Sequence, residues 1–227
     1  MIFPEIIIDQ DQALGLKHFK EMDYYAVNNY KLPIELMMEN AGLNLATLVA
    51  SFSKSGQNIC IGIGNGNNGG GGLVAARRLA AWGYNVFLDL MTDITKELPA
   101  IQLKRALKFG ASLKNINTYD VWVDAYLGFS QRLPLSDNLL KTIVAANNSS
   151  AVKISLDIPT GFLGADSSNY FCPDKVLTLA APKRILFELD KEAEIYIADL
   201  GIPKEVYLKF GVDILPFYTN SIIKQKR

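Results

Sequence analysis

Polar residues stand directly after apolar runs of the sequence, where buried strands would end. Asn67 and Asn68 follow the apolar run 58–64, Asp124 ends the segment VWVD, and Asp157 ends the segment ISLD. Ligands of an open parallel sheet bind beyond the carboxyl ends of its strands, so these side chains are expected to face one cleft. Carboxylates and amides gathered there could perform acid–base chemistry and bind a cation.

The side chains of Asn68, Asp124 and Thr160 offer only oxygen ligands. Such a set suits a hard cation such as potassium, sodium or magnesium, and not a metal that prefers thiolates. Arg132, in the polar segment that follows Asp124, could instead pair with a phosphate. Asp157 would then be the carboxylate nearest to the reacting atom.

A glycine-dense segment, GNGNNGGGG at residues 64–72, follows the first of these apolar runs. Read as a turn before a helix, it predicts a site for a phosphate-bearing, nucleotide-like molecule, because glycine permits close approach and a helix N-terminus favours anions. Gly64, Gly66 and Gly69 also match the dinucleotide pattern GxGxxG, with Asp89 at the end of the next strand. A purely structural glycine segment and turn-forming asparagines are the alternatives. A Walker loop is excluded, because no Gly-Lys-Ser/Thr follows.

The elements that would position these residues alternate between strand and helix. Strands are expected at 58–64, 84–91, 120–126, 151–157, 175–181 and 193–200, and helices at 10–30, 33–53, 72–83, 95–109 and 135–147. This alternation predicts an α/β fold, a Rossmann-like doubly wound and mainly parallel sheet with helices on both faces. We expect one domain over residues 1–227, with residues 1–55 as a helical N-terminal extension.

Composition narrows the class of partner. The 227 residues are 49% hydrophobic, and 23 basic residues balance 23 acidic ones, so no nucleic-acid or membrane partner is expected. The start MIFPEIIIDQ lacks the features of a secretory leader, which predicts a cytoplasmic protein. Cys60 and Cys172 are expected to be reduced thiols, His18 a helix-surface or packing residue, and the terminal KQKR a solvated end.

Six ordered segments carry a resemblance to a known family. They are MMENAG (37–42), GNGNNGGGGLVAARRL (64–79), VDAYLGFSQRLPL (123–135), LDIPTG (156–161), AAPKRIL (180–186) and IADLGIP (197–203). Together they resemble the NAD(P)H-hydrate epimerase family, the YjeF N-terminal domain, called apolipoprotein A-I-binding protein in animals. The resemblance implies a typically dimeric enzyme that interconverts the R and S forms of hydrated NADH and NADPH (NADHX and NADPHX), which carry a hydroxyl on carbon 6 of the nicotinamide ring.

The resemblance also implies roles for individual positions. Asp157 would be the catalytic residue and would contact the hydrated cofactor. Potassium would be bound by Asn68, Asp124 and Thr160, where Thr160 replaces a usual serine and keeps its hydroxyl. The remaining cofactor-binding residues would be Asn67, Asn68, Gly69, Gly70, Gly71, Gly128, Phe129, Ser130, Gln131, Arg132, Leu133 and Pro134. In the mechanism expected here, Asp157 protonates the departing hydroxyl and then acts as base for water that returns from the opposite face.

The sequence departs from the family pattern at two positions. Gly71 replaces an aspartate and Asn65 replaces a common proline. A non-catalytic nucleotide-binding or protein-interaction member of the family is therefore an alternative, and a dehydrogenase that uses Asp89 on the ribose is another. Many family members continue into an ADP- or ATP-dependent dehydratase. This chain has no second glycine-rich nucleotide motif, so a separate dehydratase is expected to complete the repair.

Overall fold

The computed structural model describes residues 3–213 and 219–227. The helices are α1 (Leu16–Tyr30), α2 (Ile34–Phe52), α3 (Asn67–Ala81), α4 (Glu97–Lys108), α5 (Asp137–Asn147) and α6 (Lys204–Lys209), with the short 3-10 helices η1 (Gln10–Gln12) and η2 (Arg184–Glu188). The strands are β1 (Glu5–Ile7), β2 (Asn58–Ile63), β3 (Asn85–Leu90), β4 (Val121–Ala125), β5 (Val152–Leu156), β6 (Lys175–Leu179), β7 (Glu194–Ala198) and β8 (Ile222–Lys226).

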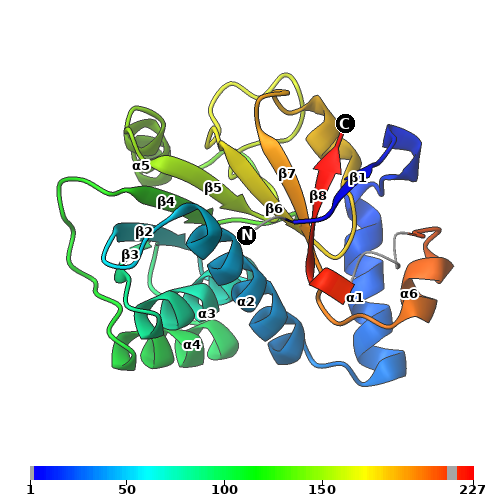
Figure 1. The fold of residues 1–227 in the computed structure, drawn as a ribbon, viewed down its shortest axis with the longest axis horizontal. Coiled ribbons are helices and arrows are strands. Elements are labelled where there is room, and N and C mark those ends of the chain that lie inside the picture. The colour runs from blue at the N-terminus through cyan, green and yellow to red at the C-terminus, as the bar shows by residue number, and fades with distance from the viewer. Residues whose placement is uncertain (1–2, 214–218) are drawn as a thin grey trace.

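The strands form one sheet in the order β1-β8-β7-β6-β5-β4-β2-β3. All neighbouring strands are parallel except β7 and β8, which are antiparallel. The chain runs from β2 outward to β3 and then returns to the other side of β2 with β4 (Figure 1). This reversal is the topological switch point at which open α/β sheets bind ligands. The predicted mainly parallel α/β sheet is confirmed.

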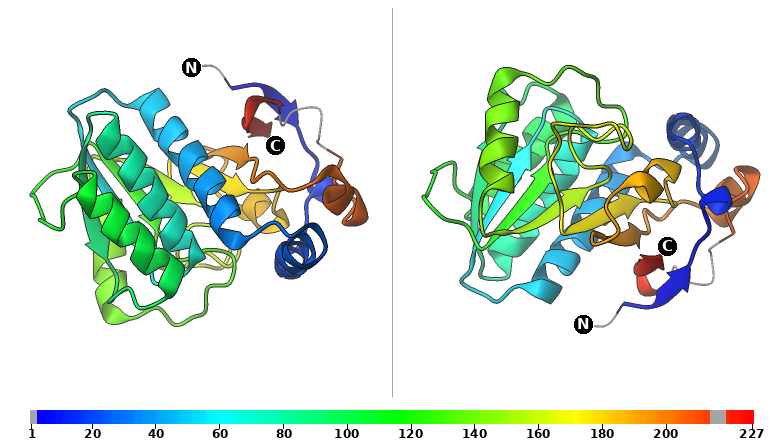
Figure 2. Two further views of the ribbon diagram at one scale, coloured as in Figure 1. Left: turned by 90° about the horizontal axis from the view of Figure 1, so that it is seen from below. Right: turned by 90° about the horizontal axis from the view of Figure 1, so that it is seen from above.

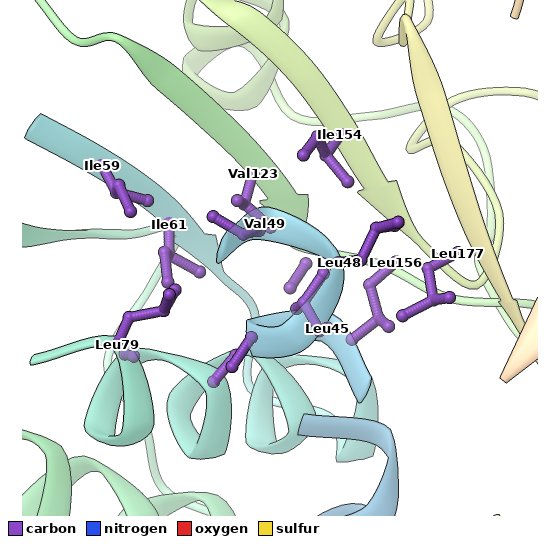
Figure 3. Close-up of a cluster of buried hydrophobic side chains, with 14 of the residues drawn as sticks. Leu45, Leu48, Val49, Ile59, Ile61, Leu79, Val123, Ile154, Leu156 and Leu177 are labelled. Carbon is purple, nitrogen blue, oxygen red and sulfur yellow. The ribbon is translucent and has the colours of Figure 1, made fainter. Parts of the chain in front are cut away.

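Helices cover both faces of the sheet, as predicted. Helices α2, α3 and α4 lie on one face and α5 lies on the other, while α1 and α6 lie beside the end of the sheet formed by β8 and β1 (Figures 1 and 2). Strand β2 is buried over almost its whole length, which explains why its sequence shows no polar alternation. Leu45, Leu48 and Val49 of α2 pack into the same core as Ile61 and Leu156 of the sheet (Figure 3).

The glycine-rich segment differs from the expectation, because α3 begins at Asn67 and not at residue 72. Gly69–Gly72 therefore belong to the helix. A Cβ atom on Gly70 would lie 2.6 Å from the side chain of Met38 on α2, and one on Gly72 would lie 2.6 Å from Ala125 on β4. These glycines allow α3 to approach α2 and the sheet closely, so much of the run has the structural role considered as the alternative.

Both ends of the chain also differ from the expectation. The predicted helix at 10–30 begins at Leu16, and β1 precedes it. The terminal KQKR is not a solvated end, because β8 pairs with β7 and β1. Arg227 donates hydrogen bonds to the carbonyl oxygens of Leu186, Leu189, Asp190 and Ala193. In the described ranges, no helix has the length and apolar character that crossing a membrane requires.

Candidate active site

A cavity of about 270 Å³ opens at the carboxyl ends of the central strands. Its walls come from α1, α2, the start of α3, the loops that follow β4 and β5, and the segment after β6. Several of the site residues predicted from the sequence line this cavity: Asn67, Asn68, Gly71, Gly128, Phe129, Ser130, Gln131 and Asp157. The structure thus brings together residues from three separate motifs of the sequence.

Other predicted cofactor-binding residues do not line the cavity. Gly69 and Gly70 are buried within α3, where a Cβ on Gly69 would collide with the carbonyl oxygen of Gly64. Arg132, Leu133 and Pro134 are exposed on the loop beyond Gln131. Their cofactor contacts stay predictions.

Asp157 follows β5 directly and is held in a constrained conformation. Its φ angle is 75°, in the left-handed region that non-glycine residues rarely adopt. Such strain costs about 1–3 kcal/mol and is concentrated at functional sites. The residue is 2% exposed. Its Oδ2 accepts a 2.7 Å hydrogen bond from the Phe129 backbone N–H, and its Oδ1 lies 2.8 Å from Lys183 Nζ.

Lys183 is the buried cation of the site. Its side chain is 0% exposed, and its ammonium donates to Thr178 Oγ1 at 3.0 Å and to the Leu179 carbonyl at 2.8 Å. The ammonium also lies 3.9 Å from the centre of the Phe19 ring. Burial lowers the pKa of Lys183, and the negative charge of Asp157 opposes that effect. The result is a desolvated ion pair on the wall of the cavity.

Asp23 of α1 is a second carboxylate on the same wall. Burial raises the pKa of Asp23 to about 6, and the negative charge of Asp157 adds to the rise while Lys183 opposes it. The sequence motifs predicted no role for Asp23 or Lys183. One available signal was helical spacing, because Asp23 lies on the same stripe of α1 as the buried Phe19 and Ala26. The other was Lys183 itself, which lies in AAPKRIL (180–186), one of the six segments that carry the family resemblance.

A separate polar cluster lies beneath the cavity around Asp124, which is 0% exposed. Its Oδ1 accepts a hydrogen bond of 2.6 Å from Thr160 Oγ1, and its Oδ2 accepts from Ser155 Oγ at 2.9 Å and from Thr160 N at 2.8 Å. Burial raises the pKa of Asp124 to about 6, although these hydrogen bonds from Thr160 and Ser155 oppose the rise. Among the ion pairs of the described residues, none includes Asp124.

Asn68 reaches the same cluster through Leu127. The Asn68 Nδ2 donates to the Leu127 carbonyl at 2.8 Å, and the Leu127 N–H donates to Thr160 Oγ1 at 3.1 Å. The Asn68 Oδ1 is buried without a hydrogen-bond partner. An amide oxygen, a hydroxyl and a carboxylate without a cationic partner among the described residues therefore lie in one buried polar region. Their role as ligands of a cation stays a prediction.

Asp89 and His18 take no part in the cavity wall. The Asp89 carboxylate accepts a hydrogen bond of 2.5 Å from the hydroxyl of Tyr126, a residue that lines the cavity. His18 packs edge-to-face with Phe210, with ring centres 6.5 Å apart, as expected for a packing residue. Cys60 and Cys172 are free thiols.

Comparison with known proteins gives a consistent set of relatives. Residues 34–185 match the family model described as YjeF-related protein N-terminus. The chain is 34% identical to the NAD(P)H-hydrate epimerase of Rhodopirellula baltica, over 86% of this chain and 87% of the relative. It is also 34% identical, over 66% of its length, to 31% of the bifunctional NAD(P)H-hydrate repair enzyme Nnr of Thermofilum pendens.

The fold is similar to a solved structure as well. The crystal structure of the yeast protein YNL200c superposes with a TM-score of 0.82 at 25% sequence identity, and the match covers 93% of this chain and 99% of the yeast chain. The match to YNL200c includes most of the chain outside residues 34–185.

Proposed function

Because the chain belongs to the family of the YjeF-related protein N-terminus, we propose that it is an isomerase, an NAD(P)H-hydrate epimerase that interconverts the R and S forms of hydrated NADH and NADPH. The Rhodopirellula baltica relative is named NAD(P)H-hydrate epimerase. The observation that carries the proposal is the Asp157–Lys183 pair, a buried carboxylate held at φ 75° on the wall of the cavity. This arrangement supports acid–base chemistry by Asp157 on a ring bound in the cavity.

The reaction needs one carbon–oxygen bond to break and an equivalent one to form. The hydroxyl on carbon 6 takes up a proton from an acidic group of the site and leaves as water, and the ring nitrogen stabilises the cation that remains. A second water then adds to the opposite face. The Lys183 ammonium and the Phe129 N–H both stabilise a negative charge on Asp157. In that form, Asp157 stabilises the cationic ring and accepts the proton of the incoming water. The wall residues Phe19, Met37 and Leu156 keep bulk water away from the ring.

The test of this function is a chiral separation of R and S hydrates after incubation with the protein. We expect the protein to bring a pure epimer to the equilibrium mixture faster than the spontaneous reaction does, by at least about 100-fold, the lower end of general acid–base catalysis. A protein that binds the hydrates without this acceleration would instead be the non-catalytic nucleotide-binding or protein-interaction member of the family. This alternative is tested because Gly71, which replaces the aspartate of the family pattern, lies on the cavity wall.

The cluster around Asp124 fits a potassium ion. The buried Asn68 Oδ1 lacks a partner, and no side-chain cation of the described residues pairs with the Asp124 carboxylate. Asn68, Asp124 and Thr160 would hold the ion, and all three offer the oxygen ligands that a hard cation requires. The ion would supply the positive charge that this buried carboxylate lacks.

We expect potassium to raise the thermal stability of the protein. An ion at about 100 times its dissociation constant stabilises the folded state by about 2.7 kcal/mol. For a chain of this size, each kcal/mol raises Tm by about 2–4 °C. The measurement is a thermal melt in potassium chloride against choline chloride at equal ionic strength. Asp124→Asn should remove the difference, and equal melting temperatures of the wild-type protein in both salts would contradict the site.

The predicted partners follow from the same function. A separate dehydratase would act on the product, since the Thermofilum pendens relative is named as a bifunctional repair enzyme and the similarity covers only 31% of it. A homodimer is supported by Leu36 and Leu43, exposed by 52% and 36%, which lie two helical turns apart on one side of α2. A cytoplasmic location stays a prediction from the sequence.

A further inference from the structure

Helix α1 brings a second carboxylate to the cavity, and its position is fixed by packing. Phe19, Met22 and Ala26 of α1 are buried, and Asp23 lies on the same side of the helix. The Asp23 side chain lines the cavity together with Asp157 and Lys183. Helix α1 lies outside residues 34–185, the part that matches the family model. The site therefore contains an acid from a segment that the family match does not include.

Lys183 is the cation among these three residues, and all the hydrogen-bond donors of its ammonium already have partners. A lysine ammonium has three donors, and those of Lys183 are directed to Asp157, Thr178 and the Leu179 carbonyl. No ion pair of the described residues includes Asp23. Two carboxyl groups thus share the field of one ammonium, and Asp157 holds it at 2.8 Å. When like charges compete in this way, the group without a direct partner retains its proton more readily.

Charged groups on the other elements around α1 interact with residues other than Asp23. Lys209 of α6 lies over the Tyr25 ring at 4.7 Å, and the charge of Glu205 acts on Tyr30. Arg184, at the start of η2, donates to the carbonyl of Ala13. The charged groups that act on Asp23 are Asp157 and Lys183, and burial together with Asp157 raises the pKa of Asp23 to about 6.

We propose that Asp23 is the acid that protonates the departing hydroxyl, while Asp157 stays ionised beside Lys183 as the base. This assignment rests on the proposed epimerase function. It gives the roles of acid and base, both predicted from the sequence for Asp157 alone, to two separate carboxyl groups. The O–H bond of Asp23 breaks as its proton joins the hydroxyl, the bond between carbon 6 and oxygen breaks, and water leaves. The ring nitrogen donates its lone pair to form the C=N bond of the cation.

The second half of the reaction restores the site. Water adds to the opposite face of the ring, its oxygen bonds to carbon 6, and the released proton goes to Asp157. Exchange through water then returns that proton to Asp23. The reverse epimerisation uses the two carboxyl groups in exchanged roles, and the cycle needs no oxidant or other reagent.

The test is the variant Asp23→Asn, assayed for epimerisation of pure R and S hydrates between about pH 5 and about pH 9, with the spontaneous rate subtracted. We expect kcat to fall about 100-fold with little change in KM, because the amide keeps the shape of the side chain and cannot donate an acidic proton. The wild-type rate should fall as pH rises above about 6, where Asp23 loses its proton. Asp23→Asn should lack this alkaline decrease, and Asp23→Glu should restore part of it.

A second measurement follows Asp23 without using activity. A carboxyl whose pKa is raised from 3.8 to about 6 on folding makes the folded state more stable below pH 3.8, and this contribution is lost as pH rises to about 6. The Tm of Asp23→Asn relative to wild type should therefore rise between these two pH values and stay level above them. Glu21→Gln, an exposed change on the same helix, should leave both the rate and the melting profile unchanged.

The outcomes separate the two proposals. Wild-type protein that does not accelerate epimerisation would overturn the epimerase function, whatever the melting profile of Asp23→Asn. Wild-type protein that is active, combined with an Asp23→Asn variant that keeps its rate and its pH profile, would overturn the role of Asp23 alone. A Tm difference that is flat across the pH range would also overturn that role.

Discussion

Asp157→Asn is expected to lower the rate of epimerisation by at least about 100-fold, and up to about 10,000-fold, the range that general acid–base groups contribute. The amide has almost the same shape, so its oxygen can still accept the hydrogen bond from the Phe129 N–H. It carries no charge to stabilise the cationic ring, and it cannot take a proton from the incoming water. Binding of the hydrate should persist, because most of the cavity wall is unchanged. The measurement combines the chiral assay with equilibrium binding.

The matched control for this prediction is Asp166→Asn. Asp166 is an exposed aspartate close to Asp157 in the chain, and it does not line the cavity. It should retain the wild-type rate. Turnover by Asp157→Asn at the wild-type rate would contradict the assignment of Asp157, and loss of binding together with loss of the rate would show that its main role is to hold the ligand.

Lys183→Met is expected to destabilise the protein by about 3–5 kcal/mol, the usual cost of removing one partner of a buried ion pair. The methionine side chain fills a similar volume and leaves the Asp157 carboxylate buried without its cation. Thermal or denaturant unfolding measures the loss.

A double-mutant cycle identifies the cause of this loss. Asp157→Asn combined with Lys183→Met removes both charges, so the pair of substitutions should destabilise the protein less than the sum of the two single changes. Lys226→Met provides an exposed comparison, because the Lys226–Glu5 pair is 55% and 42% exposed and should contribute only about 0–1 kcal/mol. Additive effects in the cycle would show that Asp157 and Lys183 do not depend on each other.

Gly71, which departs from the family pattern, lies against α2 and β5. A Cβ atom there would lie 3.2 Å from Leu156 Cδ2 and 3.7 Å from the Ala41 Cβ, so the residue forms part of the wall between α2 and β5. With glycine at this position, the carboxylates that line the cavity are Asp23 and Asp157. The proton chemistry proposed for the site uses these two groups and the Lys183 ammonium, which lies 2.8 Å from Asp157 Oδ1.

Local patterns in the sequence were sufficient for the central part of the fold. The unbroken apolar run at 58–64 predicts a strand covered on both faces, and the alternation of strands with helices predicts a parallel sheet. Parallel strands end at the same edge, so the positions of Asn68, Asp124 and Asp157 after their strands were enough to predict that they lie near one another. These inferences depend on residues a few positions apart, and the sequence contains that information directly.

Contacts between distant segments decided the rest. The glycine run belongs mostly to α3, where it allows close approach to α2 and β4, and strand β8, near the C-terminal end of the chain, pairs with β7 and β1. Asp23 and Lys183 meet Asp157 only when α1 packs beside the segment after β6. The interactions between these charges depend on burial and on contacts between distant segments, which local sequence patterns do not show. The sequence therefore identified one carboxylate of the site, and the tertiary structure showed its cation and a second carboxylate.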